Sequence, residues 1–356
     1  MFLSKRASGA ISFVKAISII AICLATLMFS GECSKGAENG IRLCLTTLVP
    51  SLFPFMAVAS YIFSSKAVQK AAKPFSGIMR VMFGLDGCFT PVILLSMIGG
   101  YPVGARAIRS LHTSGIANTE QCRRAALFAV CAGPGFLVNY IGVSLYNSSA
   151  VGAVLLAAQC MSVIFIGIIL KFTYKNKVAV RQQTKPIVKS TEGGELLVKS
   201  VLDAAKSMLS ICSFVVLFSA ATGIFCSLET KESVQRPFLI LTEVCSAVNT
   251  LSKDMPLELT AFAVGFGGLC VHFQIFSALG NVKVNKVLFF FVRILQGLFT
   301  AAFTHLGFVI FSQTTDVFST STVENAQFFG GTALSGAALL FTAVCFIYSL
   351  KNYKKN

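Results

Sequence analysis

The chain has 356 residues, of which 55% are hydrophobic and 12% are charged, and its mean hydropathy is +0.76. Apolar runs of about 20 residues, long enough to cross a bilayer, recur along nearly the whole chain and exclude an ordinary soluble protein. The net charge of +16 comes mainly from basic residues between these runs, which indicates the positive-inside rule rather than nucleic-acid binding. We therefore expect an all-α, polytopic integral membrane protein of the cell membrane, with the lipid bilayer as its first partner.

An N-terminal membrane anchor helix is expected within residues 1–40. Basic residues precede an apolar run at 16–30, whose length suits either a signal peptide or a first spanning helix. Because Glu32 lies where a cleavage site would need a small residue, we interpret the run as an uncleaved anchor.

A second span is expected at residues 41–64. Pro50 and Pro54 lie inside it, and they should kink the helix or unwind one turn because proline removes a backbone donor. A polar, basic stretch follows at 66–80.

The apolar segment at residues 88–111 is interrupted at its centre. The interruption reads Gly99-Gly100-Tyr101-Pro102-Val103-Gly104, and Arg106 and Arg109 follow it. Three glycines and a proline loosen the same turn, so the helix should break at or near Tyr101. Broken backbone inside a bilayer must be buried in protein or line a wet cavity, which makes this segment a candidate site.

A further break is predicted in the following apolar segment, at residues 125–143. Its centre reads Cys131-Ala132-Gly133-Pro134-Gly135. Ahead of this segment, Asn118 is followed three residues later by Gln121, a pattern typical of a helix start. An uninterrupted span is expected at 150–170, and the polar segment 171–199, with seven basic residues, is interpreted as a cytoplasmic loop.

The second half of the chain repeats the alternation of apolar runs and polar gaps. The apolar runs lie at residues 202–227, 238–248, 257–279, 287–311 and 328–350, before a basic tail at 351–356. The run at 257–279 contains Gly267-Gly268, followed by His272 and Gln274.

The basic residues also predict the topology. If both termini and the basic stretches at 66–80, 106–124, 171–199 and 283–293 are cytoplasmic, most of the 30 basic residues lie on one side. This requires that segment 88–111 enter and leave on the same side, and that only one of 238–248 and 257–279 cross. The expected total is about eight transmembrane helices plus two re-entrant or broken glycine-rich elements.

The two halves of the chain share a weak internal similarity. Gly99-Gly100-Tyr-Pro-Val103 aligns with Gly267-Gly268-Leu-Cys-Val271, each within a glycine-broken element that follows a long span and a polar gap. By the charge topology, the two opening spans run in opposite directions. We therefore expect an inverted repeat of units 41–170 and 200–350, which in secondary transporters places a binding site near the midplane.

Three motifs carry a resemblance to a known family: Gly100-Tyr-Pro-Val-Gly-Ala105, Ala132-Gly-Pro134 and Gly267-Gly-Leu-Cys-Val-His-Phe-Gln274. With their order and spacing, the chain resembles the sporulation integral membrane proteins of the YlbJ type, within the wider nucleoside recognition (Gate) domain group. The resemblance implies a multipass membrane protein of spore-forming bacteria that is needed for spore formation and has transporter-like architecture. It implies no particular substrate.

Polar side chains beside the predicted breaks are candidates for solute binding. His272 and Gln274 should face a cavity or, alternatively, satisfy backbone carbonyls freed at the glycine pair. Arg106 aligns with Gln274, so both would face one cavity suited to an anionic or strongly polar solute, unless Arg106 is a cytoplasmic anchor. The candidate substrate-binding residues are Gly99, Gly100, Tyr101, Pro102, Gly104, Arg106, Gly133, Pro134, Gly267, Gly268, His272 and Gln274.

The sequence contains no nucleophile elbow, no His-Glu-x-x-His motif and no phosphate-binding loop, and its cysteines are scattered singly. We therefore expect no enzyme activity, no catalytic residue, no cofactor, no metal and no nucleic-acid partner. The first functional hypothesis is a transporter-like carrier or channel for a small polar solute. The alternative is a membrane assembly factor of the developing spore envelope, whose partners would be other sporulation membrane proteins.

Overall fold

The computed structural model describes residues 13, 16–17, 20–65, 73–173, 193–228 and 231–315, and every regular element in these ranges is a helix. Five helical segments there are long and apolar enough to cross a membrane: Ser30–Ile62, Ser149–Thr173, Gly194–Ser227, Leu257–Leu279 and Lys286–Val309. A sixth is added if Ser76–Phe83 and Gly87–Gly99, which meet at 100°, are counted as one bent span. This is fewer than the eight transmembrane helices expected. The apolar run at 328–350 lies outside the described residues.

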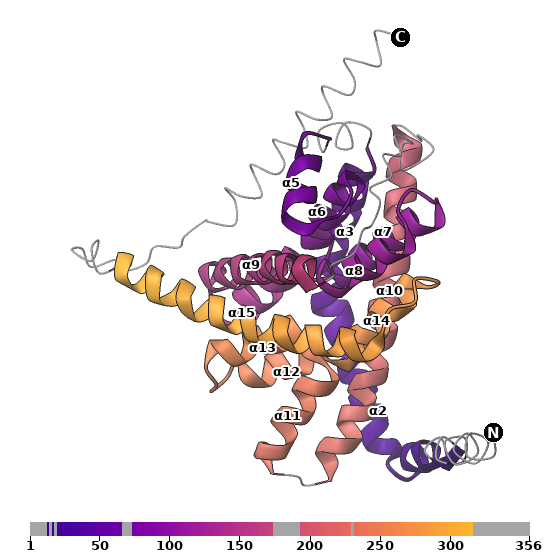
Figure 1. Cartoon of the computed structure of the whole chain (residues 1–356). Helices are drawn as coiled ribbons and strands as arrows, with labels where there is room; N and C mark the ends of the chain where they lie inside the picture. The colour runs from indigo at the N-terminus through magenta and orange to yellow at the C-terminus, as the bar shows by residue number, and fades with distance from the viewer. Residues whose placement is uncertain are drawn as a thin grey trace, which may run out of the picture.

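Figure 1 shows the arrangement of the helices. In chain order they are α2 (Ser30–Leu43), η1 (Cys44–Leu48), α3 (Val49–Ser64), η2 (Lys73–Phe75), α5 (Ser76–Phe83), η3 (Gly87–Phe89), α6 (Thr90–Gly99), α7 (Tyr101–Thr113), α8 (Thr119–Phe128), η4 (Gly135–Leu145), α9 (Ser149–Thr173), α10 (Gly194–Ser227), α11 (Glu232–Thr242), α12 (Val244–Leu251), α13 (Leu257–Phe266), α14 (Gly268–Leu279) and α15 (Lys286–Thr315). Both α9 and α10 extend into the segment 171–199 that was interpreted as loop.

The opening spans of the two halves pack against each other in opposite directions. Helices α2 and α3 are joined by the π-helical turn η1 into one rod, which runs beside α10 (Figure 1). Glycines make the contact close, since a Cβ added to Gly36 would lie 2.5 Å from the Ser219 carbonyl oxygen and one added to Gly40 would lie 2.9 Å from Ser219 Cβ. The rod passes without interruption through residue 40, where the sequence predicted a domain boundary. Its widened turn directly precedes Pro50, where a kink or unwinding was expected.

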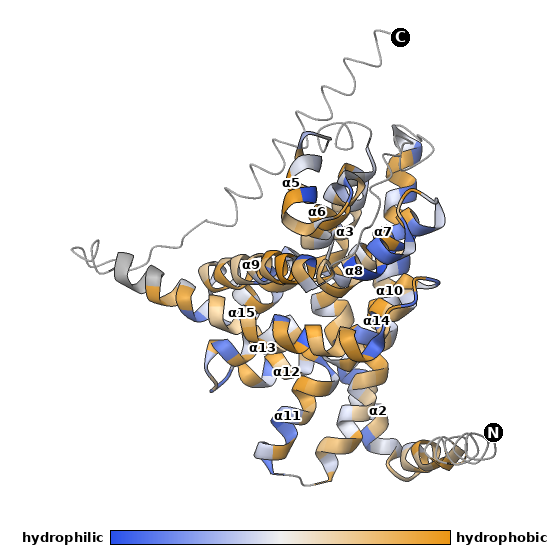
Figure 2. Ribbon diagram, in the orientation of Figure 1, coloured by the Kyte–Doolittle hydropathy of each residue, from blue (hydrophilic) through white to orange (hydrophobic). Residues whose placement is uncertain are grey.

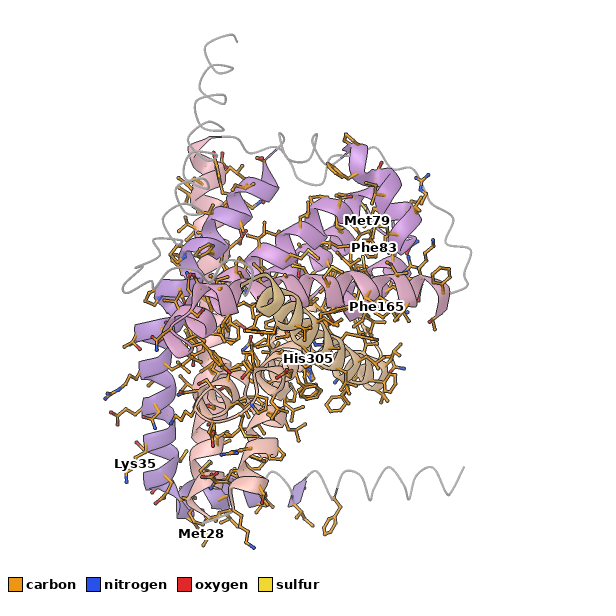
Figure 3. The ribbon with its side chains drawn as sticks, turned by 90° about the vertical axis from the view of Figure 1, so that its left-hand side faces the viewer. Met28, Lys35, Met79, Phe83, Phe165 and His305 are labelled. Carbon is orange, nitrogen blue, oxygen red and sulfur yellow. The ribbon has the colours of Figure 1, made fainter. Side chains whose placement is uncertain are left out.

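The closing spans α9 and α15 also pack antiparallel, and α13 lies against α15 (Figure 1). Buried polar side chains join the two spans, with Ser162 Oγ donating to the Gln296 carbonyl (3.0 Å) and Thr300 Oγ1 donating to Gln159 Oε1 (3.3 Å). Next to them, Phe165 of α9, labelled in Figure 3, meets the ring of Phe299 edge-on, with centroids 4.8 Å apart. The second pair of spans is therefore fixed by hydrogen bonds as well as by apolar packing.

The long helices consist mostly of hydrophobic residues (Figure 2), and many of their large hydrophobic side chains are exposed. Hydrophilic residues gather in α8, at the outer end of α7 and at the far end of α11. This distribution fits a protein whose helices contact lipid along their length. The start of α8 confirms a local prediction, because the Asn118 side chain accepts a hydrogen bond from the Gln121 amide at 2.7 Å.

Four helices are broken in the middle of the molecule, and the break at residues 129–134 removes one expected span, the apolar segment at 125–143. Three breaks confirm the predictions: at Gly100 between α6 and α7, at residues 129–134 between α8 and η4, and at Gly267 between α13 and α14. Gly100 and Gly267 adopt φ values of +85° and +86°, which disfavour a side chain. The fourth break, at Glu243 between α11 and α12, was not predicted.

The break at Gly100 reverses the chain, whereas the break at Gly267 does not. Helix α7 returns along α6, so that a Cβ added to Gly104 would lie 2.5 Å from Ser96 Cβ. Helices α13 and α14 instead continue as one apolar span. The two glycine motifs that align in sequence therefore form different structures.

Because Gly104 packs directly on Ser96, Gly104→Ala should force the α6–α7 hairpin apart and cost about 1–3 kcal/mol of stability. The measurement is the apparent melting temperature of the purified protein in detergent. Gly77→Ala is the matched control, since nothing lies within 4 Å of a Cβ added to Gly77 in α5. Equal melting temperatures for the two variants would show that α6 and α7 are not packed in this way.

Candidate functional site

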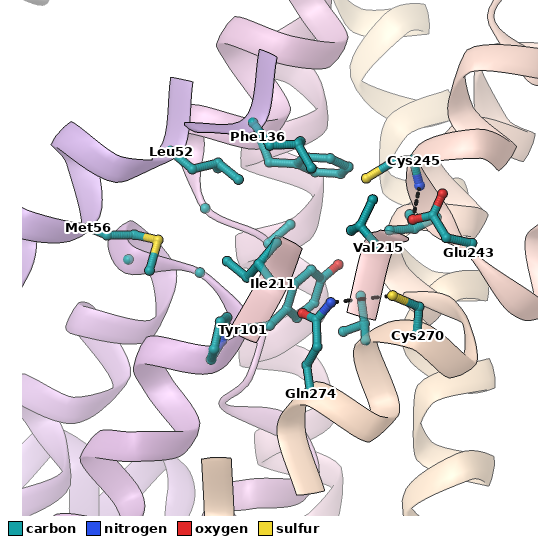
Figure 4. A pocket seen from close by; sticks show the side chains of 18 residues that line it. Leu52, Met56, Tyr101, Phe136, Ile211, Val215, Glu243, Cys245, Cys270 and Gln274 are labelled. Carbon is teal, nitrogen blue, oxygen red and sulfur yellow. Dashed lines mark hydrogen bonds between the residues drawn. The ribbon is translucent and has the colours of Figure 1, made fainter. Parts of the chain in front are cut away.

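The four helix breaks surround a cavity of about 50 Å³ in the middle of the molecule (Figure 4). Apolar side chains from both opening spans form one wall: Leu48, Leu52 and Met56 on the α2–α3 rod, with Ile211 and Val215 on α10. The broken helices form the other, where the polar residues Tyr101, Glu243 and Gln274 lie among apolar ones. A volume of this size holds a few water molecules or a very small solute.

The two breaks of the first half touch through their backbones. A Cβ added to Gly133 would lie 2.7 Å from the Ile98 carbonyl oxygen and 3.1 Å from the Gly100 nitrogen. Only glycine at position 133 leaves room for this approach. The structure thus brings together Gly100 and Gly133, which the sequence had assigned to two separate breaks, and both line the cavity.

The two breaks of the second half touch in a similar way. A Cβ added to Gly268 would lie 3.2 Å from the Thr242 carbonyl, directly before Glu243. Glu243 is fully buried, and its carboxylate accepts hydrogen bonds from the backbone amides of Cys245 (2.9 Å) and Ser246 (2.6 Å) at the start of α12. These amides and the helix dipole stabilise a carboxylate away from water.

Two tyrosines connect the breaks of one half to those of the other. Tyr101 Oη, at the first break, donates to the Val264 carbonyl at 2.6 Å, shortly before the break at Gly267. Tyr140 Oη of η4 donates to the Cys245 carbonyl at 3.5 Å. Together with the glycine contacts within each half, these hydrogen bonds join all four breaks into one assembly.

Arg293 of α15 lies at the centre of this assembly and is fully buried. Its Nη1 donates to the Val130 carbonyl (2.7 Å) and to Gln296 Oε1 (2.7 Å), and its Nε donates to the Phe266 carbonyl (3.1 Å). Its Cζ also lies 5.5 Å from the centre of the Tyr101 ring. Arg293 thus satisfies carbonyls at two breaks and contacts the residue that follows a third.

This position corrects the topology prediction, which placed Arg293 with the cytoplasmic basic residues. The sequence carried one signal for a buried role, since Gln296 follows one helical turn later within the same apolar run. Glu243, within the apolar run at 238–248, was not proposed as a site residue. It lies between two short helices with neither glycine nor proline at the break.

His272 and Gln274 have different roles. His272 Nε2 is 3.0 Å from the Phe266 carbonyl oxygen, and its ring packs edge-on against Phe266 and Phe289. This matches the alternative interpretation, in which the side chain satisfies a carbonyl freed at the glycine break. Gln274 instead lines the cavity and donates from Nε2 to Cys270 Sγ at 3.3 Å (Figure 4).

The twelve candidate residues, including His272 and Gln274, fall into three groups. The cavity is lined by Gly99, Gly100, Tyr101, Pro102, Gly133 and Gln274. Gly104, Pro134, Gly267, Gly268 and His272 shape the surrounding backbone and packing but are not among the lining residues. Arg106 lines a separate basic pocket, so the prediction that Arg106 and Gln274 face one cavity is wrong.

Comparison with known proteins found one distant relative. The chain is 21% identical over 312 residues to the sporulation integral membrane protein YlbJ of Bacillus subtilis (strain 168), and the match covers 76% of each protein. No protein-family model matches the chain, and no solved structure matches it. The long match and the apolar helices together support an integral membrane protein that is similar to YlbJ.

Removal of the Arg293 guanidinium should loosen the whole assembly. Arg293→Gln leaves buried carbonyls at Val130 and Phe266 without their charged donor, and we expect a loss of at least about 3 kcal/mol of stability. Arg293→Lys should not restore it, because one ammonium cannot reach both carbonyls as the planar guanidinium does. The readout is the melting temperature of the purified protein. If Arg293→Lys melted at the wild-type temperature, simultaneous donation by the guanidinium to both carbonyls would not be needed.

Proposed function

We propose that this chain is a membrane protein of sporulation that carries a small polar solute across the cell membrane by alternating access. The observation that carries the proposal is the cavity at which four helix breaks meet. Continuous helices would have satisfied their own backbone, whereas these breaks place polar groups at a depth where they are costly. Binding of a polar solute would explain why the protein retains these costly breaks.

The two walls of the cavity supply complementary properties. Gln274 offers an amide, Glu243 a carboxylate and Gly100 exposed backbone, while Met56, Val215 and their neighbours exclude water on the other side. Solute sites usually combine an apolar lining with a small number of oriented polar groups. The small volume agrees with a closed state from which the cavity would open by movement of the walls.

An inverted repeat would provide the two related conformations that alternating access requires. The antiparallel packing of the opening spans and of the closing spans supports this arrangement. The order of elements supports a pairing different from the sequence alignment: the break at Gly100 with that at Glu243, and the break at 129–134 with that at Gly267. In this pairing each half contributes one pair of packed short helices, which is α6–α7 in the first half and α11–α12 in the second. Each half also contributes one broken helix, which is α8–η4 in the first half and α13–α14 in the second.

The role in sporulation is inferred from similarity to YlbJ, whose name describes a sporulation integral membrane protein. The cytoplasmic placement of both termini is part of the proposal and is supported by the distribution of basic residues. Membership of the Gate domain group is part of the same proposal, and it rests on the three sequence motifs at residues 100–105, 132–134 and 267–274.

Gln274→Leu tests the proposed function. It preserves the size of the side chain but removes the amide from the cavity, so spore formation in a host that carries only this variant should fall at least about tenfold. The measurement is the count of heat-resistant spores, with the amount of protein in the membrane determined in parallel. Phe273→Leu is the matched control, because Phe273 lies next in the chain and is half exposed on the outside.

An assembly factor would respond in the opposite way. Replacement of residues 174–192 by a neutral linker of equal length would abolish sporulation, while Gln274→Leu would have no effect. The transport proposal predicts that the linker variant sporulates nearly normally. Normal spore counts for Gln274→Leu at wild-type protein levels would contradict it.

A further inference from the structure

A second hollow, separate from the central cavity, is lined by residues of α7, α10 and α14. These three helices lie on the right-hand side of Figure 1. Its volume is about 370 Å³. Its lining residues, which we call the basic pocket, are Pro102, Arg106, Arg109, Lys206, Ser210, Ser277 and Ala278. Apart from Pro102 and Ala278, each of these residues has a hydrogen-bond donor in its side chain.

Three cations from two helices line this pocket, Arg106 and Arg109 from α7 and Lys206 from α10. Arg106 Nη1 donates to the Asp203 carbonyl oxygen at 2.9 Å, which directs its guanidinium toward α10. The Arg109 guanidinium lies over the end of α14, where a Cβ added to Gly280 would be 2.9 Å from Arg109 Cζ. The carboxylate of Asp203 is the acidic group close to Arg106.

Within the described residues, none of the three cations forms an ion pair. Like charges held together repel one another unless an anion lies between them. The positive-inside rule explains basic residues in loops, but it does not explain why helices α7 and α10 direct them into one hollow.

We propose that the basic pocket binds an anionic group of the phosphate type. Arg106, Arg109 and Lys206 would neutralise the charge, and the hydroxyls of Ser210 and Ser277 would complete the hydrogen bonds. Arginine suits a phosphate because its planar guanidinium can donate two parallel hydrogen bonds to two phosphate oxygens. The volume lies in the range of small-molecule sites.

The pocket neighbours the central cavity, because Pro102 lines both. An anion bound here would therefore lie next to the break at Gly100. The inference depends on the charges of the pocket and holds whether or not the central cavity transports a solute. The same phosphate chemistry is available from a soluble phosphate-bearing molecule and from the headgroup of an anionic lipid.

The test uses the full chain in nanodiscs of neutral phosphatidylcholine. Inorganic phosphate is titrated in one arm at constant ionic strength, and phosphatidylglycerol is added to the bilayer in increasing fractions in the other. The readout is the shift of the thermal unfolding midpoint, compared among the wild type, Arg109→Gln, Lys206→Gln and the double variant. Lys253→Gln is the matched control, since it removes an exposed lysine at the end of α12 outside the pocket.

A saturable upward shift in the wild type and in Lys253→Gln, with at least about tenfold weaker apparent affinity in the double variant, would support the site. A response to phosphate would identify a soluble ligand, and a response to phosphatidylglycerol alone would identify a lipid headgroup. The inference would be overturned if neither anion raised the midpoint. It would also be overturned if the double variant, folded as judged by its own cooperative transition, responded like the control.

Discussion

The structure depends on how a buried arginine satisfies broken backbone. A bilayer offers no water to the carbonyls and amides that a helix releases when it breaks, so each break must find its partners inside the protein. Arg293 supplies them for two breaks at once, through the carbonyls of Val130 and Phe266, and contacts Tyr101 at a third. Tyr101 in turn binds Val264 across the interface between the two halves. Without this central donor, the three breaks at Gly100, at residues 129–134 and at Gly267 would have no common anchor.

This arrangement connects the fold to the proposed function. Glycines at positions 100 and 133 allow two backbones to touch, and Gly268 allows the same approach to the chain before Glu243. The breaks converge because of these contacts, and the cavity is the space that remains between them and the opening spans. The cavity thus lies between the broken helices on one side and the two antiparallel opening spans, α2–α3 and α10, on the other. The basic pocket beside Pro102 would place an anion at the edge of the same region.

Much of this architecture could be predicted from local chemistry. Glycine and proline mark the breaks at Gly100, at residues 129–134 and at Gly267, and Asn118 marks the start of α8. The contacts between distant segments could not be predicted in this way. Arg293 resembles an interfacial anchor until its partners on two other segments are known. The break at Glu243 has no glycine or proline, because its carboxylate caps the new helix instead. Arg106 and Gln274 align in sequence yet line different hollows, because the chain reverses at Gly100 but continues at Gly267.

The central claim is that the cavity opens to water on both sides of the membrane. It can be tested with a native residue, since Cys270 lies in the cavity wall. In a variant that keeps only Cys270 of the twelve cysteines, a membrane-impermeant thiol reagent is applied to right-side-out and to inverted vesicles. A variant that keeps only Cys122, which is fully buried in α8 away from the cavity, is the control. We predict labelling of Cys270 from both sides and none of Cys122. Absence of Cys270 labelling from either side would contradict alternating access.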